Sequence, residues 1–188
     1  DRKIVTVMER ANMERESKRR RQTDGALGSR SSSDSESPDS SVPPVLFLDL
    51  DGVLHSVDAQ PGDFFDKRCM LALHRLLQSS NAEVVLSSTW RLSTQLREEA
   101  YLELGQRAIH PIGDTPRRHS RAAEITAWLD ENGFACATCT QRNRRWLALD
   151  DLPLELPTDH VVQTDPLVGL TEADVDAAFQ KLQTRAVD

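Results

Sequence analysis

Carboxylate and hydroxyl side chains follow three apolar segments of the sequence, each at the point where the segment ends. Asp49 is the last but one residue of the run VLFLDL, and Asp51 directly follows that run. Ser87 directly follows AEVVL. Asp150 and Asp151 directly follow RWLAL. Carboxylates that meet at one place repel one another unless a cation neutralises them. These residue types therefore indicate a site that holds a divalent cation.

The ligand atoms in this set are all oxygens. No cluster of His or Cys accompanies Asp49, Asp51, Asp150 and Asp151 in the sequence. Oxygen ligands without imidazole or thiolate favour Mg²⁺ over Zn²⁺. The chain also carries a formal net charge of −7, which suits cation binding and is poor for general binding to nucleic-acid phosphates. We therefore expect Mg²⁺ as the cofactor, bound by these Asp residues.

Each motif also has a purely structural explanation. Asp and Gly favour turns, so DLDG alone could be a turn, and Ser-Ser-Thr after a strand could be another. Paired Asp residues after a strand are often helix caps. A catalytic interpretation is favoured because suitable residue types occur at the same end of successive predicted strands.

The elements that must position these residues alternate between strands and helices. Continuous apolar runs at 45–50, 82–86 and 145–149 predict strands buried on both faces, and Val161 is expected to begin a fourth. Capping residues and helical apolar spacing predict four helices: after Asp66, over 94–104, from Ser120 to Asn132, and after Thr171. This alternation predicts an α/β fold, a doubly wound (Rossmann-like) parallel sheet whose ligand binds beyond the carboxyl ends of the strands.

Residues 1–43 differ in composition from the rest of the chain. They contain SKRRR and the Ser-rich run GSRSSSDSESPDSS, with few large apolar residues to offset the entropy of ordering. We expect a disordered Ser/Arg-rich tail at 1–43 and one folded domain at 44–188. The SKRRR run is either a solvated charge run or a nuclear-localisation or nucleic-acid patch.

Several function classes are excluded by composition. No stretch approaches the roughly 18 apolar residues of a membrane span, so no membrane association is expected. The three cysteines argue against a disulfide framework and for a reducing compartment, cytoplasmic or, if SKRRR is a localisation signal, nuclear. The CxxC at 136–139 lacks the further ligands of a zinc site and is interpreted as a pair of buried or incidental thiols. Arg142, Arg144 and Arg145 form either a solvated loop or a contact for a nucleic-acid backbone.

The motifs together resemble the haloacid dehalogenase-like (HAD) superfamily. VLFLDLDGVLHS resembles its first motif, VVLSSTWR its second, SRAAEITAWL its third and LALDD its fourth. With TDPxxGLT they look most like the HAD subgroup named for Swiss-Army-knife RNA repair proteins, and the likeness covers residues 44–183.

This resemblance implies a phosphatase mechanism. In HAD phosphatases the first Asp of DxD attacks phosphorus and the second acts as general acid and then as base, which match Asp49 and Asp51. Ser87 matches the residue that hydrogen-bonds the phosphoryl group, with Ser88 as the alternative. Arg121 matches the cation that offsets its charge. The paired acids of LDD match the residues that complete the Mg²⁺ site.

Two assignments stay open at this point. Arg117 and Arg118 compete with Arg121 for the third motif. Arg91 either binds a second phosphate or the leaving group, or forms a salt bridge with nearby Glu98 or Glu99.

The spacing between motifs leaves little room for a cap. Only 35 residues lie between Asp51 and Ser87, and one helix and one strand use most of them, which leaves residues 55–65 as a flap. A HAD core with little or no cap is open and suits a bulky phosphorylated substrate such as an RNA or DNA end, or a phosphoprotein. The alternatives are a catalytically idle HAD-like binding module and a phosphotransferase or nucleotidase of the same fold.

Overall fold

The computed structural model of the chain describes residues 42–134 and 144–183. Three features from the sequence fall outside these ranges. They are residues 1–41 of the expected tail, the CxxC at 136–139, and Arg142.

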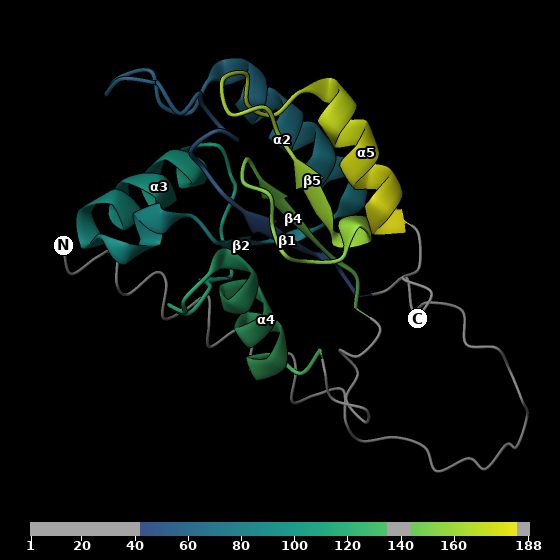
Figure 1. Cartoon of the computed structure of the whole chain (residues 1–188). Helices are drawn as coiled ribbons and strands as arrows, with labels where there is room; N and C mark the ends of the chain where they lie inside the picture. The colour runs from purple at the N-terminus through teal and green to yellow at the C-terminus, as the bar shows by residue number, and fades with distance from the viewer. Residues whose placement is uncertain (1–41, 135–143, 184–188) are drawn as a thin grey trace, which may run out of the picture. The chain divides into compact units, whose positions relative to one another are not determined.

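A five-stranded parallel sheet forms the centre of the described residues (Figure 1). Its order is β3-β2-β1-β4-β5. The strands are β1 (Val45–Leu48), β2 (Glu83–Leu86), β3 (Gly113–Asp114), β4 (Trp146–Asp150) and β5 (Val161–Gln163). Strand β1 is central and fully buried, as a continuous apolar sequence in a covered parallel sheet requires. The predicted α/β fold with a doubly wound parallel sheet is confirmed.

Helices cover both faces of the sheet (Figure 1). The helices α2 (Lys67–Ser80) and α5 (Glu172–Gln183) lie side by side, and α4 (Arg121–Glu131) lies on the opposite face. Successive side chains of β1 belong to two separate hydrophobic cores, one on each face of the sheet. Leu46 packs in the core formed with α2 and α5, and Phe47 packs in the core formed with α4. The helix α3 (Thr94–Gln106) adds Ala100 and Leu104 to the first of these two cores. Of the helices described, none is long and apolar enough to cross a membrane.

The capping residues start the helices as the sequence predicts. The Asp66 carboxylate accepts hydrogen bonds from the backbone N–H of Arg68 at 2.8 Å and of Cys69 at 3.3 Å. Ser120 accepts one from Ala123 N–H at 3.2 Å. These bonds satisfy N–H groups that have no partner within the helix.

Several elements differ from the predictions. Strands β2 and β4 each begin one residue later than expected, and β4 extends to include Asp150. The first strand ends at Leu48, so that the segment from Asp49 onward already belongs to the loop. Strand β3 was not predicted, because its two residues form no apolar run. Helix α3 continues past Gly105 to Gln106, since the helix ends only where Arg107 N–H bonds back to Leu104 O.

The basic residues near β4 have structural partners. Arg144 donates to Pro43 O at 2.5 Å and pairs with Glu83 at the start of β2. Arg145 donates to Leu182 O at 2.7 Å in α5. These contacts tie the amino ends of the strands to neighbouring elements, which favours neither a solvated loop nor a nucleic-acid contact for these two residues.

Candidate active site

The strand register brings the three predicted motifs to one edge of the sheet. Leu48 of β1 pairs with Leu86 of β2 and with Leu149 of β4. The backbone hydrogen bonds between the strands continue for one residue beyond β1 and β2. Asp49 N–H bonds to Leu149 O at 3.0 Å, and Ser87 N–H bonds to Leu48 O at 2.9 Å. We call this edge, at the carboxyl ends of β1, β2 and β4, the catalytic rim.

Three carboxylates meet on the catalytic rim. Asp49, Asp150 and Asp151 each offer an oxygen within 4.8 Å of the others, and we call them the acid cluster. Asp49 is 4% exposed and Asp150 is fully buried. Burial and then the negative charge of Asp49 raise the pKa of Asp150 to about 7. The same two causes raise the pKa of Asp151, so the cluster strongly favours a partner of positive charge.

Arg121 supplies positive charge to the acid cluster. Its Nη1 lies 3.1 Å from Asp49 Oδ2 and 2.6 Å from Asp150 Oδ2. Burial by itself would lower the pKa of Arg121, but the charges of Asp49 and Asp150 outweigh it and raise that pKa. The residue opens α4, whose N-cap Ser120 fixes where the first turn begins.

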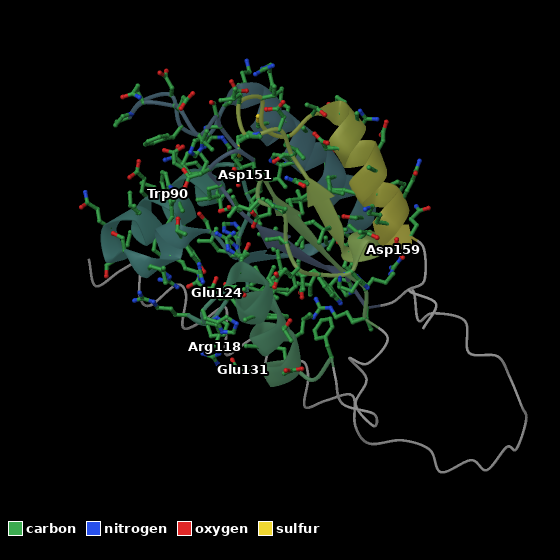
Figure 2. The ribbon with its side chains drawn as sticks, viewed as in Figure 1. Trp90, Arg118, Glu124, Glu131, Asp151 and Asp159 are labelled. Atoms are coloured by element: carbon green, nitrogen blue, oxygen red, sulfur yellow. The ribbon has the colours of Figure 1, made fainter. Side chains whose placement is uncertain are left out.

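The two competing arginines lie elsewhere. Arg118 is exposed and pairs with Glu131 at 3.0 Å on the outer side of α4 (Figure 2). Arg117 is also exposed. Of the three candidates for the third motif, the structure brings only Arg121 to the acid cluster.

Gly52 allows the first motif and the fourth to approach each other. Its φ of +69° is in the left-handed region, which favours glycine. A Cβ at this position would lie 2.6 Å from Asp151 Cβ, closer than side-chain atoms approach. Thr164 Oγ1 donates to Gly52 O at 2.7 Å and holds the turn from the side of β5.

Asp51 lies in a different environment from the acid cluster. His55 Nε2 donates to its Oδ1 at 3.0 Å, and Trp90 Nε1 is 3.1 and 3.0 Å from its two oxygens. Phe65 N–H donates to His55 Nδ1 at 3.4 Å, which assigns the ring proton to Nε2. The hydrogen bond from His55 lowers the pKa of Asp51 and, with that from Trp90, outweighs the opposing effect of burial.

The sequence indicated neither of these partners. In the sequence His55 is only the first residue of the flap, and Trp90 is only part of the second motif. The available signal was the position of His55 four residues after Asp51, within DLDGVLH. The expectation that the Asp51 carboxylate joins the other three acids differs from the structure, which directs this carboxylate at His55 and Trp90.

The two serines after β2 have different neighbours. Ser88 Oγ accepts a hydrogen bond from Trp90 N–H at 3.3 Å and caps the short helix η1 (Thr89–Leu92). Ser87 directly follows the strand and stands beside Asp49 in the ladder. The geometry therefore favours Ser87 over Ser88 as the hydroxyl beside the acid cluster.

Arg91 is buried and has neither of the roles considered from the sequence. It pairs with Glu124 of α4 at 2.5 Å instead of with Glu98 or Glu99. Its side chain is 2% exposed, so it presents no surface to a second phosphate or to a leaving group.

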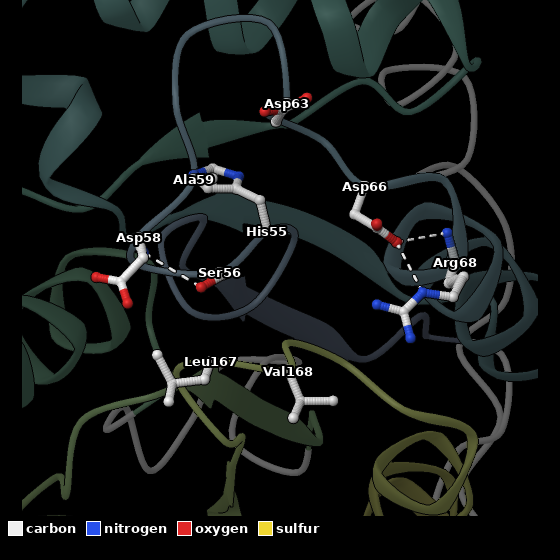
Figure 3. A pocket seen from close by; sticks show the side chains of 9 residues that line it. All are labelled: His55, Ser56, Asp58, Ala59, Asp63, Asp66, Arg68, Leu167 and Val168. Atoms are coloured by element: carbon white, nitrogen blue, oxygen red, sulfur yellow. Dashed lines mark hydrogen bonds and ion pairs between the residues drawn. The ribbon is translucent and has the colours of Figure 1, made fainter.

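A cavity of about 250 Å³ lies beside the flap, residues 55–65 (Figure 3). His55 lines it and also bonds Asp51, so the cavity neighbours the catalytic rim. Its charged lining consists of the carboxylates of Asp58, Asp63 and Asp66 and the guanidinium of Arg68. The exposed side chains of Leu167 and Val168 form an apolar wall.

One comparison with known proteins identifies relatives of this sequence. A family model described as "HAD domain in Swiss Army Knife RNA repair proteins" matches residues 45–175. No curated protein and no solved structure matches the chain. The matched region includes every residue of the acid cluster and Arg121.

Proposed function

Since the chain belongs to the family of HAD domains found in Swiss Army Knife RNA repair proteins, we propose that it is a Mg²⁺-dependent phosphohydrolase that works through an aspartyl-phosphate. The observation that carries this proposal is the acid cluster with Arg121 against Asp49 and Asp150. A fold alone does not establish a reaction, so the proposal depends on these side chains.

The residues present fit a magnesium ion. Asp49, Asp150 and Asp151 would hold it through carboxylate oxygens, and Asp51 would contribute its backbone carbonyl, because its carboxylate is directed at His55 and Trp90. When bound, a divalent cation neutralises the acids and the phosphoryl oxygens. Burial first, and then repulsion from Asp49, raise the pKa values of Asp150 and Asp151, and such an ion would offset that repulsion.

Asp49 is suited to attack phosphorus. Leu50 N–H donates to Asp49 Oδ1 at 2.8 Å, and Arg121 holds Oδ2. A bond forms between a carboxylate oxygen of Asp49 and phosphorus while the bond from phosphorus to the leaving group breaks. Arg121 offsets charge on the phosphoryl oxygens, and Ser87 donates a hydrogen bond to one of them.

Asp51 is suited to the proton transfers. In the first step it gives a proton to the leaving oxygen, and in the second it takes one from the water that attacks the aspartyl-phosphate. Its lowered pKa means that a smaller fraction is protonated at neutral pH. The second, base-assisted step is therefore favoured, and substrates whose leaving group needs no proton should react most readily.

The open side of the site suits a bulky phosphorylated substrate such as a nucleic-acid end. Between Asp51 and Ser87 the structure has only the flap, α2 and β2, and so no inserted cap domain. The flap cavity carries three carboxylates against one arginine, which disfavours a second phosphate there. The rest of a nucleic-acid chain should leave the site on the side away from the flap.

Turnover of p-nitrophenyl phosphate with and without Mg²⁺ tests the proposed reaction. We expect hydrolysis in Mg²⁺ that EDTA abolishes. A panel of 3′- and 5′-phosphorylated oligonucleotides, nucleotides and phosphopeptides then tests the substrate class. A purified, folded chain that hydrolyses none of these substrates in Mg²⁺ would overturn the proposal and favour an idle binding module.

A further inference from the structure

Arg91 donates three hydrogen bonds to backbone carbonyls beneath the catalytic rim. Its Nη1 donates to Ser87 O at 2.8 Å and to Ser88 O at 2.7 Å. Its Nε donates to Thr115 O at 2.9 Å, just beyond β3. One guanidinium therefore fixes the loop that carries Ser87 and ties it to the neighbouring strand.

The fourth partner of Arg91 connects it to Arg121. Glu124 Oε2 lies 2.5 Å from Arg91 Nη2 and 3.7 Å from Arg121 Nε. All three side chains are less than 10% exposed. Glu124 thus lies between two buried guanidiniums, close to one and at the limit of contact with the other.

We propose that Arg91 is a positioning residue for phosphoryl transfer: it holds Ser87 in place and binds Glu124 so that Arg121 stays directed at Asp49 and Asp150. This inference rests on the proposed function. Arg91 does not touch the acid cluster and acts through Ser87 and Glu124.

Removal of Arg91 would change the pairing around Glu124. Glu124 would keep the hydrogen bond from Arg118 N–H to its Oε1 at 3.2 Å but would lose its close ion pair. A buried carboxylate without its ion-pair partner is unfavourable, and the nearest remaining cation is Arg121. Arg121 would turn toward Glu124 and away from the acid cluster. The carbonyls of Ser87, Ser88 and Thr115 would also lose a buried donor.

Lysine cannot replace this arrangement. Arginine offers five N–H donors in a planar fork, whereas lysine offers one compact ammonium on a flexible stem. The partners of Arg91 are three carbonyls and one carboxylate, reached through Nε, Nη1 and Nη2. We therefore expect Arg91→Lys to keep the pairing with Glu124 but to release the Ser87 loop.

The chain contains a matched control, Arg144, which contacts the amino end of β2, whereas Arg91 contacts the loop after its carboxyl end. The Arg144 side chain is 9% exposed, pairs with Glu83 and donates to the carbonyl of Pro43. Arg144→Met therefore removes a guanidinium of low exposure that pairs with a carboxylate and a backbone carbonyl, without altering the catalytic rim. Any loss of activity specific to Arg91→Met is then separated from general destabilisation.

The experiment compares Arg91→Met, Arg144→Met and the double variant Arg91→Met/Glu124→Gln. Steady-state rates on p-nitrophenyl phosphate are measured below the melting temperature of every variant. We expect kcat to fall at least about tenfold in Arg91→Met, because small misplacement of reacting groups is costly, and to stay near wild type in Arg144→Met. The double variant should recover part of that loss, since Arg121 no longer has a competing carboxylate.

A second measurement does not depend on turnover. Tungstate, which mimics the transferring phosphoryl group, should raise the melting temperature of wild type and Arg144→Met, and less so that of Arg91→Met. Equal rates and equal tungstate protection in Arg91→Met and Arg144→Met would overturn the inference. So would a double variant no more active than Arg91→Met. If wild type itself hydrolyses nothing, the proposed function fails, and the tungstate comparison alone decides the role of Arg91.

Discussion

Asp49 and Asp51 are two residues apart in the sequence and lie in opposite environments. Asp49 is buried beside two further carboxylates, and a guanidinium holds it. Asp51 is half-buried on the flap side, where His55 and Trp90 hold it by hydrogen bonds. In the first environment opposite charges are in direct contact, and in the second hydrogen bonds from two aromatic side chains dominate.

This difference suits two chemical roles. A nucleophile must be held in place, and Arg121 and the backbone N–H of Leu50 hold the two oxygens of Asp49. An acid/base must exchange a proton, which a fixed positive charge in direct contact would hinder. Enzymes that use two carboxylates commonly separate their roles by environment in this way.

The largest expected effect comes from removal of the nucleophile. Asp49→Asn keeps the size of the side chain and should lower kcat on p-nitrophenyl phosphate by at least about a thousandfold, as loss of a nucleophile does elsewhere. Circular dichroism should show the fold unchanged. Rates near wild type in this variant would contradict the role of Asp49.

Asp51→Asn should have an effect that depends on the leaving group. For alkyl phosphates, which need a proton on the departing oxygen, we expect a loss of about a hundredfold or more. For the first step with aryl phosphates the loss should be smaller. Burst-phase kinetics over a series of substituted phenyl phosphates and alkyl phosphates measures the difference. An equal loss on both kinds of substrate would show that Asp51 does not protonate the leaving group.

The strand ends were predictable because they depend on local sequence. Apolar runs place Asp49, Ser87 and Asp150 at one edge wherever the strands are parallel. The partner of Arg91 was not predictable. Glu124 lies 33 residues after Arg91, and no local pattern pairs them. The nearby acids Glu98 and Glu99 were the natural expectation, but α3 does not place them at Arg91.

Changes around Asp51 should be milder and visible in pH profiles. His55→Gln removes the main cause of the lowered pKa of Asp51, so that pKa should rise. Because more Asp51 is then protonated, we expect the base-dependent limb of the pH–rate profile to move to higher pH, with kcat reduced about tenfold or less. The matched control is His74→Gln in α2, whose His bonds Arg107 O away from the site. If the limb does not move in His55→Gln, then the hydrogen bond from His55 does not set the pKa of the catalytic base.

The smallest expected effect concerns stability around the acid cluster. The pKa of Asp150 is raised from 3.8 to about 7 in the folded state, so ionisation costs stability progressively as pH rises through this range. Mg²⁺ should offset that cost, and its stabilisation should be small at pH 5 and larger at pH 8. We expect a shift in melting temperature of about 5 °C at saturating Mg²⁺.

Differential scanning calorimetry in Mg²⁺ and in EDTA at the two pH values measures this effect. Asp150→Asn should reduce the dependence on both pH and Mg²⁺. A Mg²⁺ shift that is equal at both pH values would contradict the assigned electrostatics of the acid cluster.

Asp49 is the residue that must accept the phosphoryl group in the proposed mechanism. Asp51→Asn mixed with an aryl phosphate and Mg²⁺ should form the aspartyl-phosphate but hydrolyse it slowly, because the base for the second step is lost. After acid quenching, intact-mass and peptide spectra should show one added phosphoryl group on Asp49, and Asp49→Asn/Asp51→Asn should show none. Substrate consumption without any added phosphoryl group, or a phosphoryl group on another residue, would contradict the mechanism.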